Sequence, residues 1–130
     1  MIKKNIFIAS YPKSGNTWLR TIIASLLQNN NDFEFSKLNN IRLFSDIYNF
    51  KFFKDKKFQK NGNLDFNWLS NNWINAQRKI NSNTDKNIIF KTHSVRGKIN
   101  GNFFTDESVC LGFIYVIRDP RDIIIYSILS

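Results

Sequence analysis

Three short apolar segments, set among stretches of helical periodicity, are the feature that most restricts how this chain can fold. The first is NIFIAS at residues 5–10, the second is IIFKTH at 88–93, and the third is LGFIYVIRD at 111–119. Short apolar runs bounded by turn residues are typical of buried strands. Strands that alternate with helices favour a parallel sheet with crossover helices, so the sequence predicts an α/β fold.

The helices expected between these strands are marked by spacing and by capping residues. Apolar residues recur at helical intervals over 17–28, and the asparagines at 29–31 would end that helix. Asp65 is placed to cap a helix over 66–80, and Asp119 followed by Pro120 predicts the start of another. Residues 32–63 have no clear period, and we expect short helices separated by loops there.

Size and composition restrict the class of protein. A chain of 130 residues is long enough for one domain with a substantial core. Its net charge of +9 favours anionic partners such as nucleotides, nucleic acids, sulfated or phosphorylated molecules, or acidic membranes. Cys110 is the only cysteine and His93 the only histidine, which excludes an internal disulfide and argues against a metal site. Without an evident signal peptide or transmembrane segment, we expect a cytoplasmic protein.

The loop between the first strand and the first helix reads YPKSGN, and it is the strongest candidate for a binding site. Free backbone N–H groups and the helix dipole attract anions at such a turn. The residues that would take part are Lys13, Ser14, Gly15, Asn16 and Thr17. The alternative is a plain connecting loop with a surface lysine, since the Walker pattern of Gly-Lys followed by Ser or Thr is absent.

Two further polar clusters follow the other strands, and ligands bind beyond the carboxyl ends of the strands in such sheets. His93 stands beside Lys91 at the end of the second strand, where it would act as a general base or form a structural hydrogen bond. Arg118 and Arg121 follow the third strand, where they would hold a phosphate or pair with the nearby aspartates.

These three motifs, in this order, resemble those of the sulfotransferases that use 3′-phosphoadenosine 5′-phosphosulfate (PAPS). YPKSGNTW resembles that family's 5′-phosphosulfate loop, KTH its catalytic-histidine segment, and YVIRDPRD its 3′-phosphate motif. The resemblance implies a P-loop-like parallel sheet flanked by helices, with PAPS as co-substrate, an acceptor with a hydroxyl or amine, and no metal. It identifies neither the acceptor nor the oligomeric state.

The resemblance also implies a role for each matching residue. The 5′-phosphosulfate and the nucleotide would be held by Lys13, Ser14, Gly15, Asn16, Thr17 and Trp18. Lys13 would stabilise charge on the leaving phosphate, Lys91 would help to hold the sulfonate oxygens, and Arg118 would bind the 3′-phosphate. His93 would take the proton from the acceptor as its oxygen or nitrogen attacks sulfur.

The sequence departs from the family pattern in three places. Asn16 stands where the family often has threonine. The serine that contacts the 3′-phosphate ordinarily falls one residue before Ser127, at Tyr126 here. Either the Tyr126 or the Ser127 hydroxyl would make that contact, or the contact is lost. The family's basic, glycine-containing C-terminal segment has no counterpart, which predicts one incomplete domain over 1–130. The apolar side chains then expected to lack part of their usual cover are Ile123, Ile124, Ile125, Ile128 and Leu129.

The lysine-rich piece at residues 51–60 leaves two interpretations open. It is either a solvated segment with buried aromatic side chains or a basic surface for an acidic partner. Trp68 and Trp73 are expected to lie in the core or in a pocket wall rather than to form a nucleic-acid platform. Three functions remain as hypotheses: a PAPS-dependent sulfotransferase, a nucleotide-binding remnant without activity, and a basic nucleic-acid-binding module.

Overall fold

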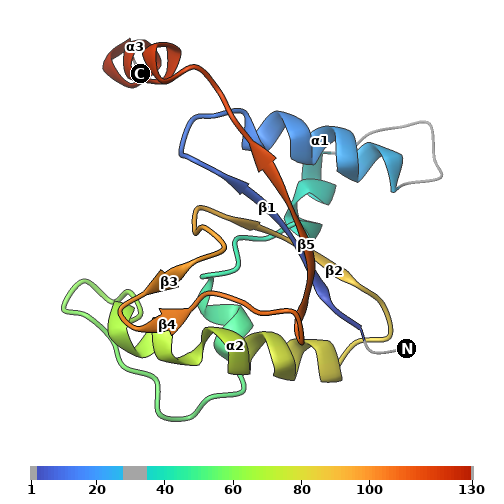
Figure 1. Cartoon of the computed structure of the whole chain (residues 1–130), viewed down its shortest axis with the longest axis vertical. Helices are drawn as coiled ribbons and strands as arrows, with labels where there is room; N and C mark the ends of the chain where they lie inside the picture. The colour runs from blue at the N-terminus through green and yellow to red at the C-terminus, as the bar shows by residue number, and fades with distance from the viewer. Residues whose placement is uncertain (1–2, 28–34, 130) are drawn as a thin grey trace.

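A three-stranded parallel sheet forms the centre of the molecule in the computed structural model, which describes residues 3–27 and 35–129. The strands are β1 (Asn5–Ser10), β2 (Ile88–Thr92) and β5 (Cys110–Val116), in the order β2-β1-β5. Both neighbours pair with β1 in parallel register (Figure 1). The predicted α/β fold with a parallel sheet flanked by helices is therefore confirmed.

Three α-helices accompany the sheet: α1 (Asn16–Leu26), α2 (Phe66–Ser82) and α3 (Pro120–Leu129). The predicted cap of α2 is confirmed, because the Asp65 carboxylate accepts a hydrogen bond from the Trp68 N–H at 2.9 Å. The predicted start of α3 is also confirmed, with the Asp119 carboxylate accepting from the Arg121 N–H at 2.9 Å. The first helix was expected to continue to residue 28, but α1 ends at Leu26 with Leu27 as its C-cap, and the asparagines at 29–31 lie outside the described residues.

The two faces of the sheet carry different cores. On the α2 face, Phe7 contacts the rings of Phe44, Phe90 and Phe104 at centroid distances of 5.5, 6.1 and 5.0 Å. Trp73 of α2 packs edge-on against Phe104, and Trp68 is buried in the same cluster, so the core interpretation of both tryptophans is confirmed. The α1 face is aliphatic and is built from Ile8, Ala24 and Ile41.

The middle of the chain contains short 3-10 helices at Phe35–Asn40 and Ile47–Phe50, separated by loops as predicted. This segment also extends the sheet edge beyond β2. The Lys91 N–H donates to the Arg42 carbonyl at 2.8 Å, and the Phe44 N–H donates to the Lys91 carbonyl at 2.9 Å. Residues that the sequence left ambiguous therefore pair with the strand that leads to His93.

The structure corrects the sequence-based expectation at two points. The third strand was expected to be buried, but Leu111 and Tyr115 of β5 are exposed, because β5 is an edge strand of the sheet among the described residues. The connection after β2 contains an unpredicted hairpin, β3 (Lys98–Ile99) with β4 (Asn102–Phe103). Its turn is formed by Asn100 and Gly101, both with positive φ, and Asn-Gly is the strongest short-range hairpin signal.

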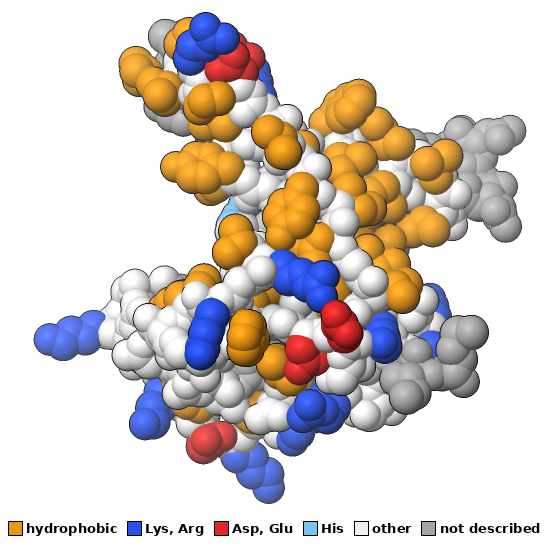
Figure 2. Space-filling model, in the orientation of Figure 1, with side chains coloured by type: hydrophobic (Ala, Val, Ile, Leu, Met, Phe, Trp, Pro, Cys, Tyr) orange, Lys and Arg blue, Asp and Glu red, His pale blue; other side chains and the backbone are white. Residues whose placement is uncertain are grey.

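Helix α3 lies beyond the carboxyl end of β5, at the top of Figure 1. Ile124, Ile125 and Ile128 are exposed, as the sequence predicted, but Ile123, which was also expected to lack cover, is buried. The Leu129 side chain lies outside what the structure describes. Hydrophobic side chains are conspicuous in this upper part of the molecule, around α1, α3 and the end of β5, whereas lysines and arginines are more numerous lower down (Figure 2). On the face that Figure 2 shows, apolar surface therefore lies near the carboxyl end of β5.

Candidate functional site

The carboxyl ends of β1, β2 and β5 meet at one edge of the sheet and border a cavity of about 750 Å³. Ser10 and Ser14 contribute to it after β1, His93 after β2, and Arg118 after β5. Ile123 on α3 closes part of the rim. The fold thus brings together one member of each polar cluster that the sequence singled out.

The loop after β1 presents an open helix N-terminus. Gly15 is the N-cap of α1 with φ 94°, a left-handed conformation, and it offers no side chain that could occupy the first N–H groups. The Leu19 N–H donates to the Gly15 carbonyl at 3.1 Å, so the N–H groups of the preceding first-turn residues have no partner within the helix. Lys13 is exposed and also has positive φ, and Ser14 is buried. This geometry suits an anion.

His93 is held by Ser10, the last residue of β1, which comes directly before the loop at residues 11–16, called the cradle below. Its Nδ1 lies 2.8 Å from the carbonyl oxygen of Ser10, 83 residues away in sequence. A carbonyl oxygen only accepts hydrogen bonds, so Nδ1 carries a proton, and in the neutral ring the free lone pair is on Nε2. The side chain is otherwise exposed, and Nε2 is chemically able to take a proton.

Asn16 has an unexpected orientation. Its side chain is buried, and Nδ2 donates to the Ser10 hydroxyl at 3.0 Å and to the Ile8 carbonyl at 3.3 Å. The amide therefore points back into the end of β1 rather than outward from the loop. A contact between Asn16 and a nucleotide, as the resemblance implies, is left to its backbone N–H at the first position of α1.

Lys91 points to the α1 face of the sheet, where its register partner on β1 is Ile8. Burial lowers the pKa of Lys91, and the positive charge of Arg20 lowers it further. Arg20 on α1 donates from Nη2 to the Leu38 carbonyl at 2.8 Å. The sequence contains no signal that Arg20 lies near Lys91, because only the crossing of α1 over the sheet brings the two side chains together.

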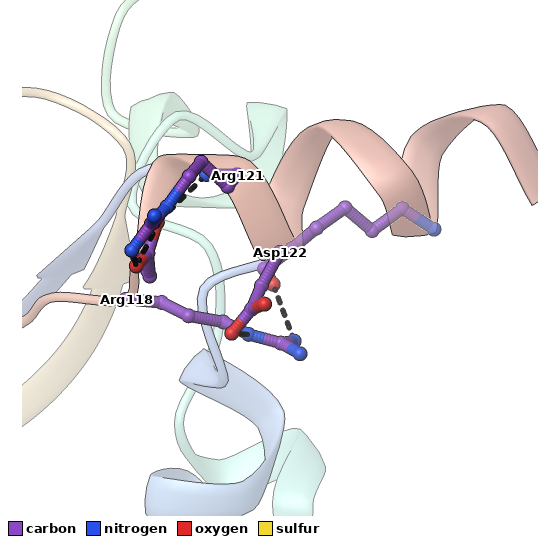
Figure 3. A network of polar contacts seen from close by, with 5 residues as sticks. Arg118, Arg121 and Asp122 are labelled. Carbon is purple, nitrogen blue, oxygen red and sulfur yellow. Dashed lines mark hydrogen bonds and ion pairs between the residues drawn. The ribbon is translucent and has the colours of Figure 1, made fainter.

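The two arginines after β5 have different surroundings (Figure 3). Arg121 forms a close ion pair with Asp119, at 2.6 Å between Nη2 and Oδ2, and this pair holds the pKa of the Asp119 carboxyl below its usual range. Arg118 makes long contacts, 3.5 Å from Nη1 to the Lys13 carbonyl and 3.8 Å from Nε to the Asp122 carboxylate. The sequence offered pairing with an aspartate as the alternative role of these arginines, and this pairing is strongest for Arg121. Arg118 also contacts the loop after β1.

The remaining predicted site residues lie around this centre. Thr17 and Trp18 occupy the first turn of α1 and are exposed, with 71% of the Trp18 side chain accessible. Tyr126 and Ser127 belong to α3, but their side chains lie outside what the structure describes. The choice between these two hydroxyls stays a prediction.

The basic segment at residues 51–60 packs its aromatic side chains inward in part. Phe52 and Phe53 contact the aromatic core on the α2 face, whereas Phe58 is half exposed. Lys51 lies over the Tyr48 ring at 4.5 Å, and its Nζ donates to the Tyr48 hydroxyl at 3.2 Å, which lowers the pKa of that phenol. The buried-aromatic interpretation holds for the start of this segment.

The lengths of the helices bear on membrane insertion, and comparisons with known proteins bear on the family of the chain. In the described ranges 3–27 and 35–129, no helix combines the length and apolar content needed to cross a membrane. No curated protein and no solved structure gave a significant match to the sequence. A protein-family model described as the sulfotransferase domain matches residues 3–128, nearly the whole chain, and the chain therefore belongs to the sulfotransferase family.

Proposed function

We propose that this protein binds PAPS and transfers its sulfonate group to a hydroxyl or amine of an acceptor. The observation that carries the proposal is the meeting of three groups at one edge of the sheet. These are an open helix N-terminus, the Arg118 guanidinium, and a histidine whose Nδ1 is bonded to the Ser10 carbonyl at 2.8 Å. An anion site, a cation for a second phosphate and a proton acceptor are the groups that such a transfer requires.

The donor would be an anionic nucleotide, whose charge would be attracted by Arg118 at the largely apolar cavity and by the open N-terminus of α1. The backbone N–H groups of the first turn of α1 would bind the 5′-phosphosulfate, together with Lys13 and the hydroxyls of Ser14 and Thr17. Arg118 would hold the 3′-phosphate with its forked donors, and a hydroxyl of Tyr126 or Ser127 would add a further contact. Trp18, exposed on the same turn, would stack on or flank the nucleotide.

The chain's own groups would perform the proton and charge chemistry. PAPS, when bound, supplies the sulfonate and leaves as adenosine 3′,5′-bisphosphate. His93 would accept the acceptor's proton at Nε2 while the acceptor oxygen or nitrogen forms the new bond to sulfur and the sulfur–phosphate oxygen bond breaks. Lys13 would neutralise the charge that develops on the leaving phosphate, and Lys91 would approach the sulfonate oxygens from the α1 side.

Calorimetric titration with adenosine 3′,5′-bisphosphate tests the binding half of this proposal. We expect wild-type protein to bind, and Lys13→Ala and Arg118→Ala each to weaken binding about 10- to 100-fold, since a hydrogen bond to a charged group contributes roughly 1.5–3 kcal/mol. Arg121→Ala is the matched control, because Arg121 is already paired with Asp119. A wild-type protein that folds but does not bind the bisphosphate would refute the proposal.

Transfer is tested with radiolabelled PAPS and a panel of hydroxyl and amine acceptors. His93→Ala should lower the rate by about 10²- to 10⁴-fold, the usual contribution of a general base. If the wild type binds the bisphosphate but transfers nothing to any acceptor, the nucleotide-binding remnant is the better description. Binding to DNA or RNA that falls steeply with salt and is not displaced by the bisphosphate would favour the nucleic-acid-binding module.

A cytoplasmic location belongs to the same proposal. It is supported by the single cysteine, Cys110, which leaves the chain without an internal disulfide. Fractionation of cells that express the tagged chain would test it, and recovery in a secreted or membrane fraction would contradict it.

A further inference from the structure

The buried amide of Asn16 connects the first residue of α1 to the last residue of β1. Both hydrogen atoms of its NH₂ group are used, one toward the Ser10 hydroxyl at 3.0 Å and one toward the Ile8 carbonyl at 3.3 Å. The Ile8 carbonyl only accepts, which assigns the nitrogen to this side of the amide. Within the described part of the chain, the amide oxygen has no hydrogen-bond partner although it is buried.

Ser10 forms hydrogen bonds to both the Asn16 amide and the His93 ring. Its hydroxyl accepts from Asn16, and its carbonyl accepts from Nδ1 of His93 at 2.8 Å. The Ser10 side chain is itself buried, so its hydroxyl has little water with which to replace the lost bond. A shift of the Ser10 backbone would move the carbonyl that accepts the Nδ1 proton of His93.

We propose that Asn16 is a positioning residue for His93, acting through Ser10, rather than a side-chain ligand of the nucleotide. This inference rests on the proposed function, in which His93 is the general base. Threonine, the residue often found at this place in the family that the sequence resembles, has a single hydroxyl donor. The amide supplies two donors, which is the number that the end of β1 accepts here.

The position of the Ser10 carbonyl determines which ring nitrogen of His93 is free to accept a proton. When Nδ1 donates to Ser10, the lone pair of Nε2 is the site that accepts a proton from the acceptor. Neutral imidazole in water favours the opposite tautomer, with the proton on Nε2 and no acceptor lone pair there. Loosening the Ser10 carbonyl would thus lower the fraction of His93 that is ready to act as a base, while leaving the first-turn N–H groups of α1 in place.

Nitrogen-15 NMR of the single histidine tests this directly, since it distinguishes the two tautomers without any transfer reaction. We expect wild-type His93 to be protonated on Nδ1, and Asn16→Leu, which keeps the size, adds no charge and removes both donors, to shift the ring toward the Nε2-protonated form. In the transfer assay the same variant should lose about tenfold in kcat, with less than a threefold change in bisphosphate affinity. Asn16→Thr, which restores one donor, should recover part of both signals.

Two further variants separate an effect on the His93 tautomer from an effect on the stability of the fold. Ala24→Gly weakens the packing of α1 at a buried residue on the sheet side, and it should lower stability without changing the His93 tautomer. Ser10→Ala removes the hydroxyl that accepts from Asn16, and it replaces Asn16→Leu if that variant does not fold.

Two results would overturn the inference: an Nε2-protonated His93 in the wild type, or a tautomer that neither Asn16→Leu nor Ser10→Ala changes. Loss of bisphosphate affinity in parallel with rate in the Asn16 variants would also overturn it, because that pattern indicates a nucleotide ligand. Failure of the wild type to transfer sulfonate would instead refute the proposed function. The NMR result would then still decide whether Asn16 sets the tautomer of the ring.

Discussion

Replacing Gly15 with alanine tests whether the cradle depends on a left-handed backbone. Gly15 has φ 94° and ψ 14° at the N-cap of α1. A Cβ placed there would meet the nearest atom, Cγ1 of Val116, at 3.9 Å, which is an ordinary contact. Steric overlap with neighbours therefore contributes nothing, and the cost comes from the backbone angle alone. For an L-residue in this region that cost is about 1–2 kcal/mol.

Two other glycines provide controls for this substitution. Gly62 also has positive φ, 82°, and open space around it, so Gly62→Ala should lose a similar amount of stability far from the cradle. Gly112 in β5 has open space and no positive φ, so Gly112→Ala should change stability by less than about 1 kcal/mol. With roughly 4 °C of melting temperature per kcal/mol for a domain of this size, Gly15→Ala and Gly62→Ala should each melt about 4–8 °C lower.

Only Gly15→Ala should also lose ligand affinity. Relaxation of the strained angle would turn the N–H groups of Asn16 and Thr17 away from the anion, and each lost charge-assisted hydrogen bond weakens binding about 10-fold or more. Thermal unfolding and calorimetry with adenosine 3′,5′-bisphosphate measure the two effects separately. The reasoning fails if Gly15→Ala is as stable as Gly112→Ala, or if it binds the bisphosphate as tightly as the wild type.

Three further substitutions test other parts of the structure. Asp65→Ala should lower the free energy of unfolding by about 1 kcal/mol, because its carboxylate caps α2 at 2.9 Å, and a urea midpoint equal to the wild type would contradict this. Gln77→Ala should lower the free energy of unfolding by roughly 2–4 kcal/mol in the same titration. The Gln77 amide hydrogen-bonds the buried Phe104 carbonyl at 2.7 Å and the buried Thr105 hydroxyl at 2.5 Å, and the variant leaves both without this partner. A decrease below about 1 kcal/mol would show that water replaces the amide. Lys91→Met should abolish transfer yet raise stability at neutral pH, because burial lowers the pKa of Lys91 in the folded state and its protonated form is destabilising there. The wild type should gain stability as pH rises from the folded pKa toward the ordinary lysine pKa, and a Lys91→Met protein with the same alkaline rise would refute this assignment.

Local signals in the sequence account for the elements that were predicted correctly. The apolar run of β1, the capping aspartates at 65 and 119, and Pro120 act within a few residues, so they specify structure before any tertiary contact forms. The hairpin at Asn100 and Gly101 had an equally local signal and could have been found. The exposure of β5 had no such signal, because an apolar strand can have the same sequence pattern at the centre and at the edge of a sheet.

The amino-acid sequence by itself determined which residues stand at the ends of the three strands, and through its motifs it placed the chain in the sulfotransferase family. It did not determine that Asn16 turns inward, or that His93 donates to a carbonyl 83 residues away. Those contacts depend on the packing of β2 beside β1 and on the left-handed turn at Gly15. A sequence pattern reports what each segment prefers locally, whereas the orientation of a side chain between two segments is decided by the neighbours that the fold brings to it.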